Sequence, residues 1–135
     1  MDVSSNNTQA IADQEDEGTE VHIRDANDEK QFFGPKNDQP VTITVVGTYS
    51  SRYRRLVAAN RDRAIKRRSL DGDDLEQRSL DLVAGCIIAW DGFTAGSQPY
   101  PLTKANAVAL LDACPWIREQ VEAAMNNHAL FFKAS

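Results

Sequence analysis

The sequence predicts an α+β fold that is predominantly helical, with a small antiparallel sheet followed by about four packed α-helices. Two patterns predict this fold. Residues 41–46 alternate like a strand, whereas apolar residues after position 48 recur at helical spacing. The length of 135 residues, with 41% hydrophobic and 26% charged residues, fits one ordinary globular domain. We expect that domain to span residues 20–135, with the sheet in residues 20–47 and the helices in residues 48–135.

Residues 1–19 are expected to form a disordered acidic tail. They consist mainly of Ser, Asn, Gln, Asp and Glu, and beyond the initial Met only Val3 and Ile11 are large apolar residues. Such a segment cannot bury enough apolar surface to offset the entropy that it loses on ordering. A second interpretation stays open, in which the segment is an acidic arm that covers a basic surface of this chain or of a partner.

Residues 20–47 are typical of a β-meander, in which short strands are joined by tight turns. The clearest strand is residues 41–46, which are β-branched, alternate, and stop at Gly47. Because a small sheet is only marginally stable alone, helices are expected to cover one of its faces. The side chains expected on that covered face are Val41, Ile43 and Val45, together with Val21 or Ile23.

A basic helix is predicted over residues 50–68. Ser50 or Ser51 can cap this helix by accepting a hydrogen bond from a free backbone N–H. Its narrow apolar stripe falls at helical spacing and consists of Tyr53, Leu56, Val57, Asn60 and Ala64.

Three further helices complete the prediction. The most apolar one covers residues 74–90 and is expected to lie at the centre of the core, with Gly92 suited to a left-handed stop after it. A loop stiffened by two prolines fills residues 94–102, and Thr103 caps the next helix. Pro115 then begins the last helix. The inward face of the helix at 74–90 is expected to carry Leu75, Leu82, Val83, Cys86, Ile87 and Trp90.

No motif in the chain predicts catalysis, a metal or a cofactor. The two histidines, His22 and His128, have no ligand-spaced neighbour, and no phosphate-binding loop or nucleophile elbow occurs. The chain is therefore not expected to be an enzyme. No apolar run approaches the roughly 18 residues that span a membrane, and the N-terminus does not read as a secretory signal. Cys86 and Cys114 are interpreted as buried thiols in a reducing cytoplasm.

The net charge of −5 hides three electrostatic blocks, which are acidic, basic and acidic in turn. The basic block, residues 48–68, carries eight Arg or Lys and a single acid. Three interpretations compete for this helix: a solvated or self-paired surface, a contact with another protein, and a nucleic-acid site. An isoelectric point near 4.9 and few nearby aromatic residues disfavour nucleic acid.

The C-terminal segment at 129–133 is strongly apolar. Two interpretations stay open for it, since it can dock on the core or form an exposed patch for a partner. On charge and hydropathy together, the side chains proposed to bind a partner are Arg52, Arg55, Arg63, Arg67, Leu130, Phe131 and Phe132.

Four stretches of the chain carry a family likeness. The first is a strand, a glycine and a basic helix that starts with Ser (residues 41–54). The second is a helix that ends in Trp with an acidic-Gly turn after it (87–93). The third is a proline loop that leads into a capped helix (100–111), and the fourth is Cys-Pro-Trp-Ile-Arg-Glu-Gln-Val (114–121). Through these stretches, residues 40–133 resemble the tail assembly chaperones of long-tailed bacteriophages and prophages.

The resemblance implies a function without catalysis. A chaperone of this family is made in the cytoplasm of the bacterial host, binds the tape measure protein, helps to recruit major tail tube subunits during tail morphogenesis, and is absent from the mature virion. The resemblance also implies a further partner, a longer form of the same protein made by ribosomal frameshifting. It implies no cofactor, no membrane and no nucleic acid.

Two other functions remain as alternatives. The first is a structural tail or connector protein that stays in the virion. The second is a small nucleic-acid-binding regulator that uses the basic helix at 52–68, whose affinity would fall steeply with salt.

Overall fold

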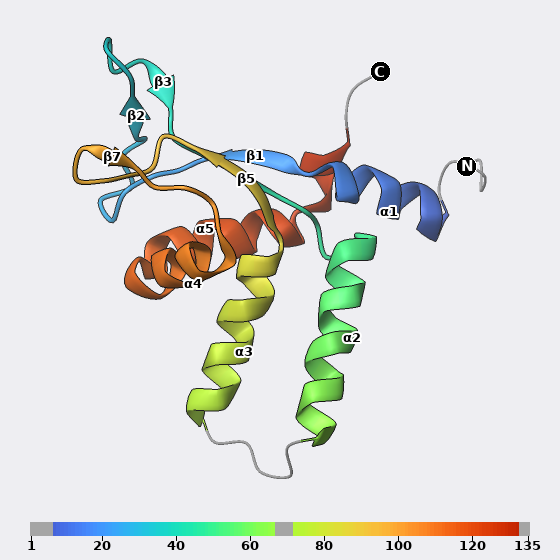
Figure 1. Ribbon diagram of the computed structural model, residues 1–135. Coiled ribbons are helices and arrows are strands. Elements are labelled where there is room, and N and C mark those ends of the chain that lie inside the picture. Colours follow the sequence, from blue (N-terminus) through green and yellow to red (C-terminus); the bar gives the residue numbers. More distant parts are fainter. Residues whose placement is uncertain (1–6, 67–71, 133–135) are drawn as a thin grey trace.

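The computed structural model describes residues 7–66 and 72–132 (Figure 1). Its centre is a three-stranded antiparallel sheet of β1 (Thr19–His22), β4 (Thr42–Val45) and β5 (Ile87–Asp91), in the order β1-β4-β5. In the register, Ile43 of β4 lies opposite Val21 on one side and Trp90 on the other. The fold is α+β and mostly helical, as predicted.

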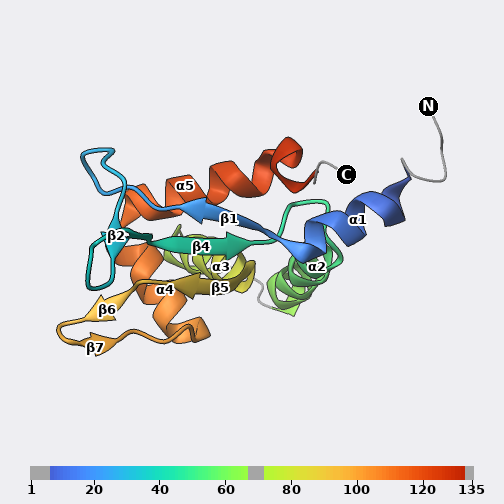
Figure 2. The same cartoon turned by 90° about the horizontal axis from the view of Figure 1, so that it is seen from above.

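Helices cover one face of this sheet. Helix α5 (Pro115–Asn126) packs against β1 and β4, while α3 (Gly72–Gly85) packs against β5 and α4 (Lys104–Ala113) packs against α3 and α5. From the side the sheet lies above these helices (Figure 1), and from above its strands cross in front of them (Figure 2). The sheet therefore has one core face and one face over which no helix of the described residues lies, which explains its alternating pattern.

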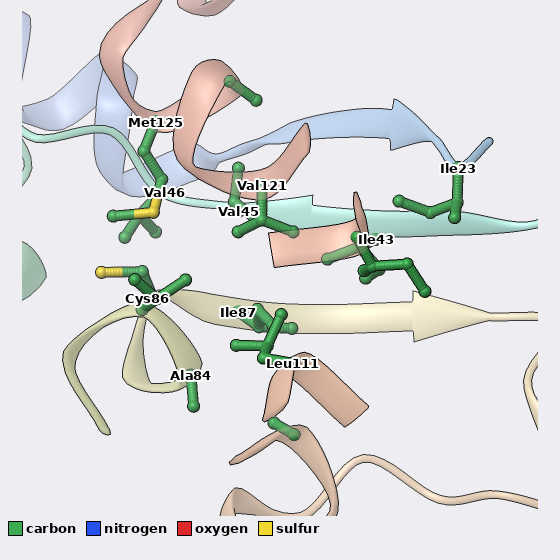
Figure 3. Packing of buried hydrophobic residues seen from close by; sticks show 14 of the residues in the cluster. Ile23, Ile43, Val45, Val46, Ala84, Cys86, Ile87, Leu111, Val121 and Met125 are labelled. Atoms are coloured by element: carbon green, nitrogen blue, oxygen red, sulfur yellow. The ribbon is translucent and has the colours of Figure 1, made fainter. Parts of the chain in front are cut away.

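The core-facing side chains of the sheet are those expected from the alternation of residues 41–46. Val41, Ile43 and Val45 are buried, as is Ile23 beside them, whereas Thr42 between them is only half-buried. Figure 3 shows Ile43 and Val45 of β4 among residues from α3, α4 and α5. The prediction for this face is confirmed. The residues labelled in the figure that form this shared core are Ile23, Ile43, Val45, Val46, Ala84, Cys86, Ile87, Leu111, Val121 and Met125.

Helix α2 (Ser51–Lys66) runs beside α3 and packs against it (Figure 1). The part of the chain that the structure describes has four α-helices after residue 48, which matches the prediction, and their predicted caps are present too. The hydroxyl of Ser50 accepts a hydrogen bond from the backbone N–H of Tyr53, and that of Thr103 accepts one from Asn106. Pro115 occupies the first turn of α5. These local signals fit because each cap satisfies a backbone N–H that the helix leaves free.

The helix predicted over residues 74–90 is wrong in its last turn. Helix α3 ends at Gly85, and residues 87–91 form the edge strand β5, which pairs with β4. A short apolar run with β-branched and aromatic residues suits a strand as well as a helix, and pairing with β4 decides between them. Ile87 and Trp90 still face the core, but they do so from the sheet.

The predicted meander in residues 20–47 also needs correction. The two phenylalanines form β2 (Phe32–Phe33), which pairs with β3 (Gln39–Pro40) in a hairpin separate from the main sheet. The third strand of the main sheet comes instead from β5, far along the chain. A second small hairpin, β6 (Thr94–Ala95) with β7 (Gln98–Pro99), lies within the loop predicted at 94–102.

The expectation of a disordered tail over residues 1–19 is wrong for the part that the structure describes. Residues 8–17 form the helix α1 (Thr8–Glu17), whose Ala12 is fully buried. Asn7 caps this helix by accepting a hydrogen bond of 2.9 Å from the N–H of Ala10, and Gly18 ends it with a φ of +83°. Residues 1–6 lie outside the described part.

Candidate interaction surfaces

Helix α1 docks on the turn that precedes α2 through a buried carboxylate. Glu15 is 1% exposed, and its Oε1 accepts a hydrogen bond of 2.8 Å from the backbone N–H of Tyr49. Its Oε2 lies 2.7 Å from Nδ1 of His128, which belongs to the short 3-10 helix η1 (His128–Phe131). Because both oxygens have partners, this acid can be buried without a large penalty. The cluster joins α1, η1 and the turn that precedes α2.

Gly47 makes that docking possible. A β-carbon at this position would lie 1.9 Å from Oε1 of Glu15, which no side chain could tolerate without a shift. The glycine that ends the predicted strand therefore has a second role, because it leaves room for Glu15. The contact between Glu15 and Tyr49 joins positions far apart in the sequence, and such a contact leaves no periodic pattern. The pattern of residues 1–19 therefore could not indicate this contact.

Asp16 caps the N-terminus of α2 from outside. Its two oxygens accept hydrogen bonds from the backbone N–H groups of Ser51 at 3.2 Å and Arg52 at 3.1 Å. Partial burial by itself would raise the pKa of Asp16, but the hydrogen bonds from Arg52 and Ser51 outweigh it and hold this pKa below its usual value of 3.8. The carboxylate also lies at the positive end of the helix dipole of α2.

We expect Asp16→Asn to lower the free energy of unfolding by about 1 kcal/mol at neutral pH, because it removes a charged cap. A carboxyl whose folded-state pKa is depressed contributes stability above its unfolded pKa and loses it as pH falls through the folded value. The difference in the free energy of unfolding between wild type and variant should therefore reach its full size at a pH well above 3.8 and should shrink below that pH. Urea titrations at a series of pH values check this, and a difference that is constant with pH would contradict it.

The predicted basic side chains divide into structural and exposed ones. Nε of Arg52 donates a hydrogen bond of 2.6 Å to the carbonyl of Gly85, so Arg52 ties α2 to the end of α3. Arg55 is exposed and attracts Asp16 electrostatically. The side chain of Arg63 and the whole of Arg67 lie outside the described residues. Arg54 and Arg61, which were not among the predicted site residues, are exposed as well.

The three predicted apolar residues at the C-terminal end do not share one surface. Phe131 is 2% exposed and belongs to the interior, whereas Leu130 and Phe132 are 47% and 60% exposed. Of the two interpretations, docking on the core holds for Phe131. Leu130 and Phe132 remain available to a partner. Alternate exposure follows from η1, which turns successive side chains to different sides.

Tyr49 links the exposed part of η1 to the start of α2. Its ring stacks on that of His128 with 3.8 Å between centroids and an angle of 6° between the planes, yet Tyr49 remains 52% exposed. A hollow of about 350 Å³ lies beside it and is lined by Ile11, Thr48, Tyr49 and Arg54. The structure thus places an apolar hollow at one end of the basic helix.

An aromatic hollow of about 500 Å³, which was not foreseen, lies between β5 and the β6–β7 hairpin. Trp90 stacks on Tyr100 with 5.8 Å between ring centroids, and its indole N–H donates a hydrogen bond to the carbonyl of Tyr100. Phe93 lies 5.1 Å from Trp90 in the same group. The density of aromatic and proline residues in 90–101 was the available signal. The helix predicted over residues 74–90 conceals this signal, because it places Trp90 in a helix.

Neither cysteine is placed for chemistry. Cys86 is fully buried, and burial raises the pKa of its thiol to about 12. Burial raises the pKa of Cys114 as well. Among the described residues no cluster of His, Cys, Asp and Glu could hold a metal ion, and no described helix is long and apolar enough to cross a membrane.

We expect Cys86 to resist thiol reagents in the native protein, because the reactive thiolate is scarce and the sulfur has no access to solvent. Half-buried Cys114 should react first and slowly. Mass spectrometry after timed treatment with iodoacetamide measures both rates. Equal labelling of the two cysteines under native conditions would contradict the burial of Cys86, and labelling in denaturant serves as the control.

Comparisons with known proteins add no family to these observations. A scan against models of protein families, a search of curated proteins and a search of solved structures each gave no match to this chain.

Proposed function

We propose that this protein is a phage tail assembly chaperone, which binds the tape measure protein and helps to recruit tail tube subunits in the host cytoplasm without entering the mature virion. The likeness of residues 40–133 to that family supports the proposal. The observation that carries it is the surface around α2, where exposed arginines lie beside exposed Tyr49. Such a surface suits reversible contact with another protein.

The chemistry of this surface fits a transient holder. Exposed charges speed and orient association and keep a complex soluble, and each exposed ion pair adds only about 0.2–1 kcal/mol, so several pairs are needed for an appreciable affinity. Apolar side chains that become buried on contact supply most of the binding energy. Tyr49, Leu130 and Phe132 can do so, because each is about half or more exposed. A partner held by a few such side chains can leave when tail tube subunits compete for it.

The four stretches that carry the resemblance also supply one core. Ile43 and Val45 come from the first stretch, Ile87 from the second, Leu111 from the third and Val121 from the fourth, and all belong to the same buried cluster. The resemblance therefore rests on residues that pack together.

The experiment is an affinity purification of the tagged protein from producing cells, with nuclease added, beside mass spectrometry of purified particles. We expect the tape measure or tail tube protein to be recovered from cells and the bait to be missing from particles. Bait retained in particles would make the protein a structural tail or connector component. Recovery of nucleic acid that nuclease abolishes, with no tail protein, would point to the regulator.

A further inference from the structure

The inner side of α2 packs against the core, and this packing leaves the basic residues of the helix on its outer side. Tyr53 and Leu56 are half-buried and pack against the core, and a β-carbon on Gly85 of α3 would lie 2.9 Å from Leu56. Arg52 is held by the carbonyl of Gly85. The register of the helix is therefore determined, and it turns Arg54, Arg55 and Arg61 to solvent.

The charge of these arginines is not neutralised within the described residues. There Arg54 and Arg61 form no ion pair or hydrogen bond through their side chains, and Arg55 has only the attraction of Asp16. Asp62 is the single acid on the described surface of α2. Four arginines against one aspartate over residues 51–62 leave a local positive charge in a chain of net charge −5.

An apolar position lies at one end of this basic side. The hollow of about 350 Å³ that is lined by Ile11, Thr48, Tyr49 and Arg54 borders the first turn of α2. From Arg54 to Arg61 the helix rises roughly 10 Å, or about two turns. The surface therefore offers one apolar pocket followed by about two turns of positive charge.

We propose that the outer side of α2 binds an amphipathic helix that has acidic residues over two successive turns and one large apolar side chain at the end that meets the hollow. The acidic residues would pair with Arg54, Arg55 and Arg61, and the apolar side chain would fill the space beside Tyr49. This inference deepens the proposed function and rests on it for the owner of the helix, which would be a segment of the tape measure protein.

Charge complementarity favours an acidic protein helix over nucleic acid. Duplex DNA presents a phosphate about every 1.7 Å of its axis and needs an extended basic surface. Here the basic side covers about two turns, and α1 next to it carries Asp13, Asp16 and Glu17. Those acids would repel a continuous phosphate backbone that ran past the end of α2. A helix with acids confined to two turns avoids them.

The test uses two synthetic 18-residue helical peptides. The probe has Glu at positions i, i+4 and i+7 and one Leu a turn earlier, and the control peptide has Gln in place of each Glu. Fluorescence anisotropy with the full chain at low salt should show binding of the probe and at least about tenfold weaker binding of the Gln peptide. Raising the salt to about 300 mM should weaken the binding of the probe.

Two double variants of equal charge change locate the site. Arg54→Glu with Arg61→Glu should weaken binding of the probe at least about tenfold. Lys30→Glu with Lys36→Glu, at exposed positions before and within the β2–β3 hairpin, should change it less than about twofold. Circular dichroism shows whether each variant keeps its helices. The milder pair Arg54→Gln with Arg61→Gln replaces the first if it unfolds.

The outcomes separate this inference from the proposed function. Equal binding of both peptides, or equal losses in both double variants, would overturn the inference. Tighter binding of a DNA duplex than of the probe, abolished by the Arg54 and Arg61 variants, would assign the surface to nucleic acid and overturn it too. If the probe binds as expected but the tape measure protein is not recovered from cells, the surface stands and the proposed function fails.

Discussion

Gly47→Ala is expected to lower the free energy of unfolding by about 3 kcal/mol or more. The added β-carbon would lie 1.9 Å from Oε1 and 2.5 Å from Cδ of Glu15, so that this carboxylate must leave its place. Moving it breaks the hydrogen bond from the N–H of Tyr49 and the contact with His128. Overpacking and the loss of partners for a buried charge each cost about 1–3 kcal/mol. Urea unfolding of the purified variants measures the change.

Two controls separate this clash from the general effect of replacing a glycine. Gly96→Ala adds a methyl group where no atom lies within 4 Å, so only its φ of +64° should matter, at about 1 kcal/mol. The double variant Glu15→Ala with Gly47→Ala should lose less stability than the sum of the single changes, since the first removes the atoms that clash. Additive losses, or a Gly47→Ala variant as stable as wild type, would show that Glu15 does not occupy this place.

Ile43→Ala should lower the free energy of unfolding by about 3 kcal/mol. Ile43 is fully buried at the middle of the central strand, with Val21 and Trp90 opposite it on the neighbouring strands. The truncation leaves a cavity, because the strands on both sides and the helices on the core face cannot move in to close it. Truncating a buried isoleucine to alanine lowers the free energy of unfolding by about 2–5 kcal/mol. Thermal and urea unfolding both report the change.

Thr42→Ala is the matched control, because Thr42 precedes Ile43 on the same strand and points to the face opposite the core, which no described helix covers. This substitution should lower the free energy of unfolding by less than about 1 kcal/mol. If the two variants lost equal stability, the assignment of one core face and one open face to this sheet would be wrong.

Features with a local cause were predictable from the sequence. The alternation of residues 41–46 indicated which side chains face the core, because the side-chain period of a strand is two. Ser50, Thr103 and Pro115 indicated where helices begin, because each satisfies or replaces a backbone N–H within a few residues. The basic side of α2 also follows from composition and helical spacing alone. The exposed arginines were therefore foreseeable as a candidate surface.

Features that depend on contacts between distant residues were not predictable. Residues 87–91 form a strand because β4 offers an edge to pair with, although the same apolar run also suits a helix. Helix α1 is held by Glu15 and Asp16, whose partners lie more than thirty positions away and leave no periodic trace. Phe131 is buried and Phe132 is exposed where η1 packs against α1 and α5. Local propensity acts through near neighbours, whereas burial and pairing depend on which distant segments the fold brings together.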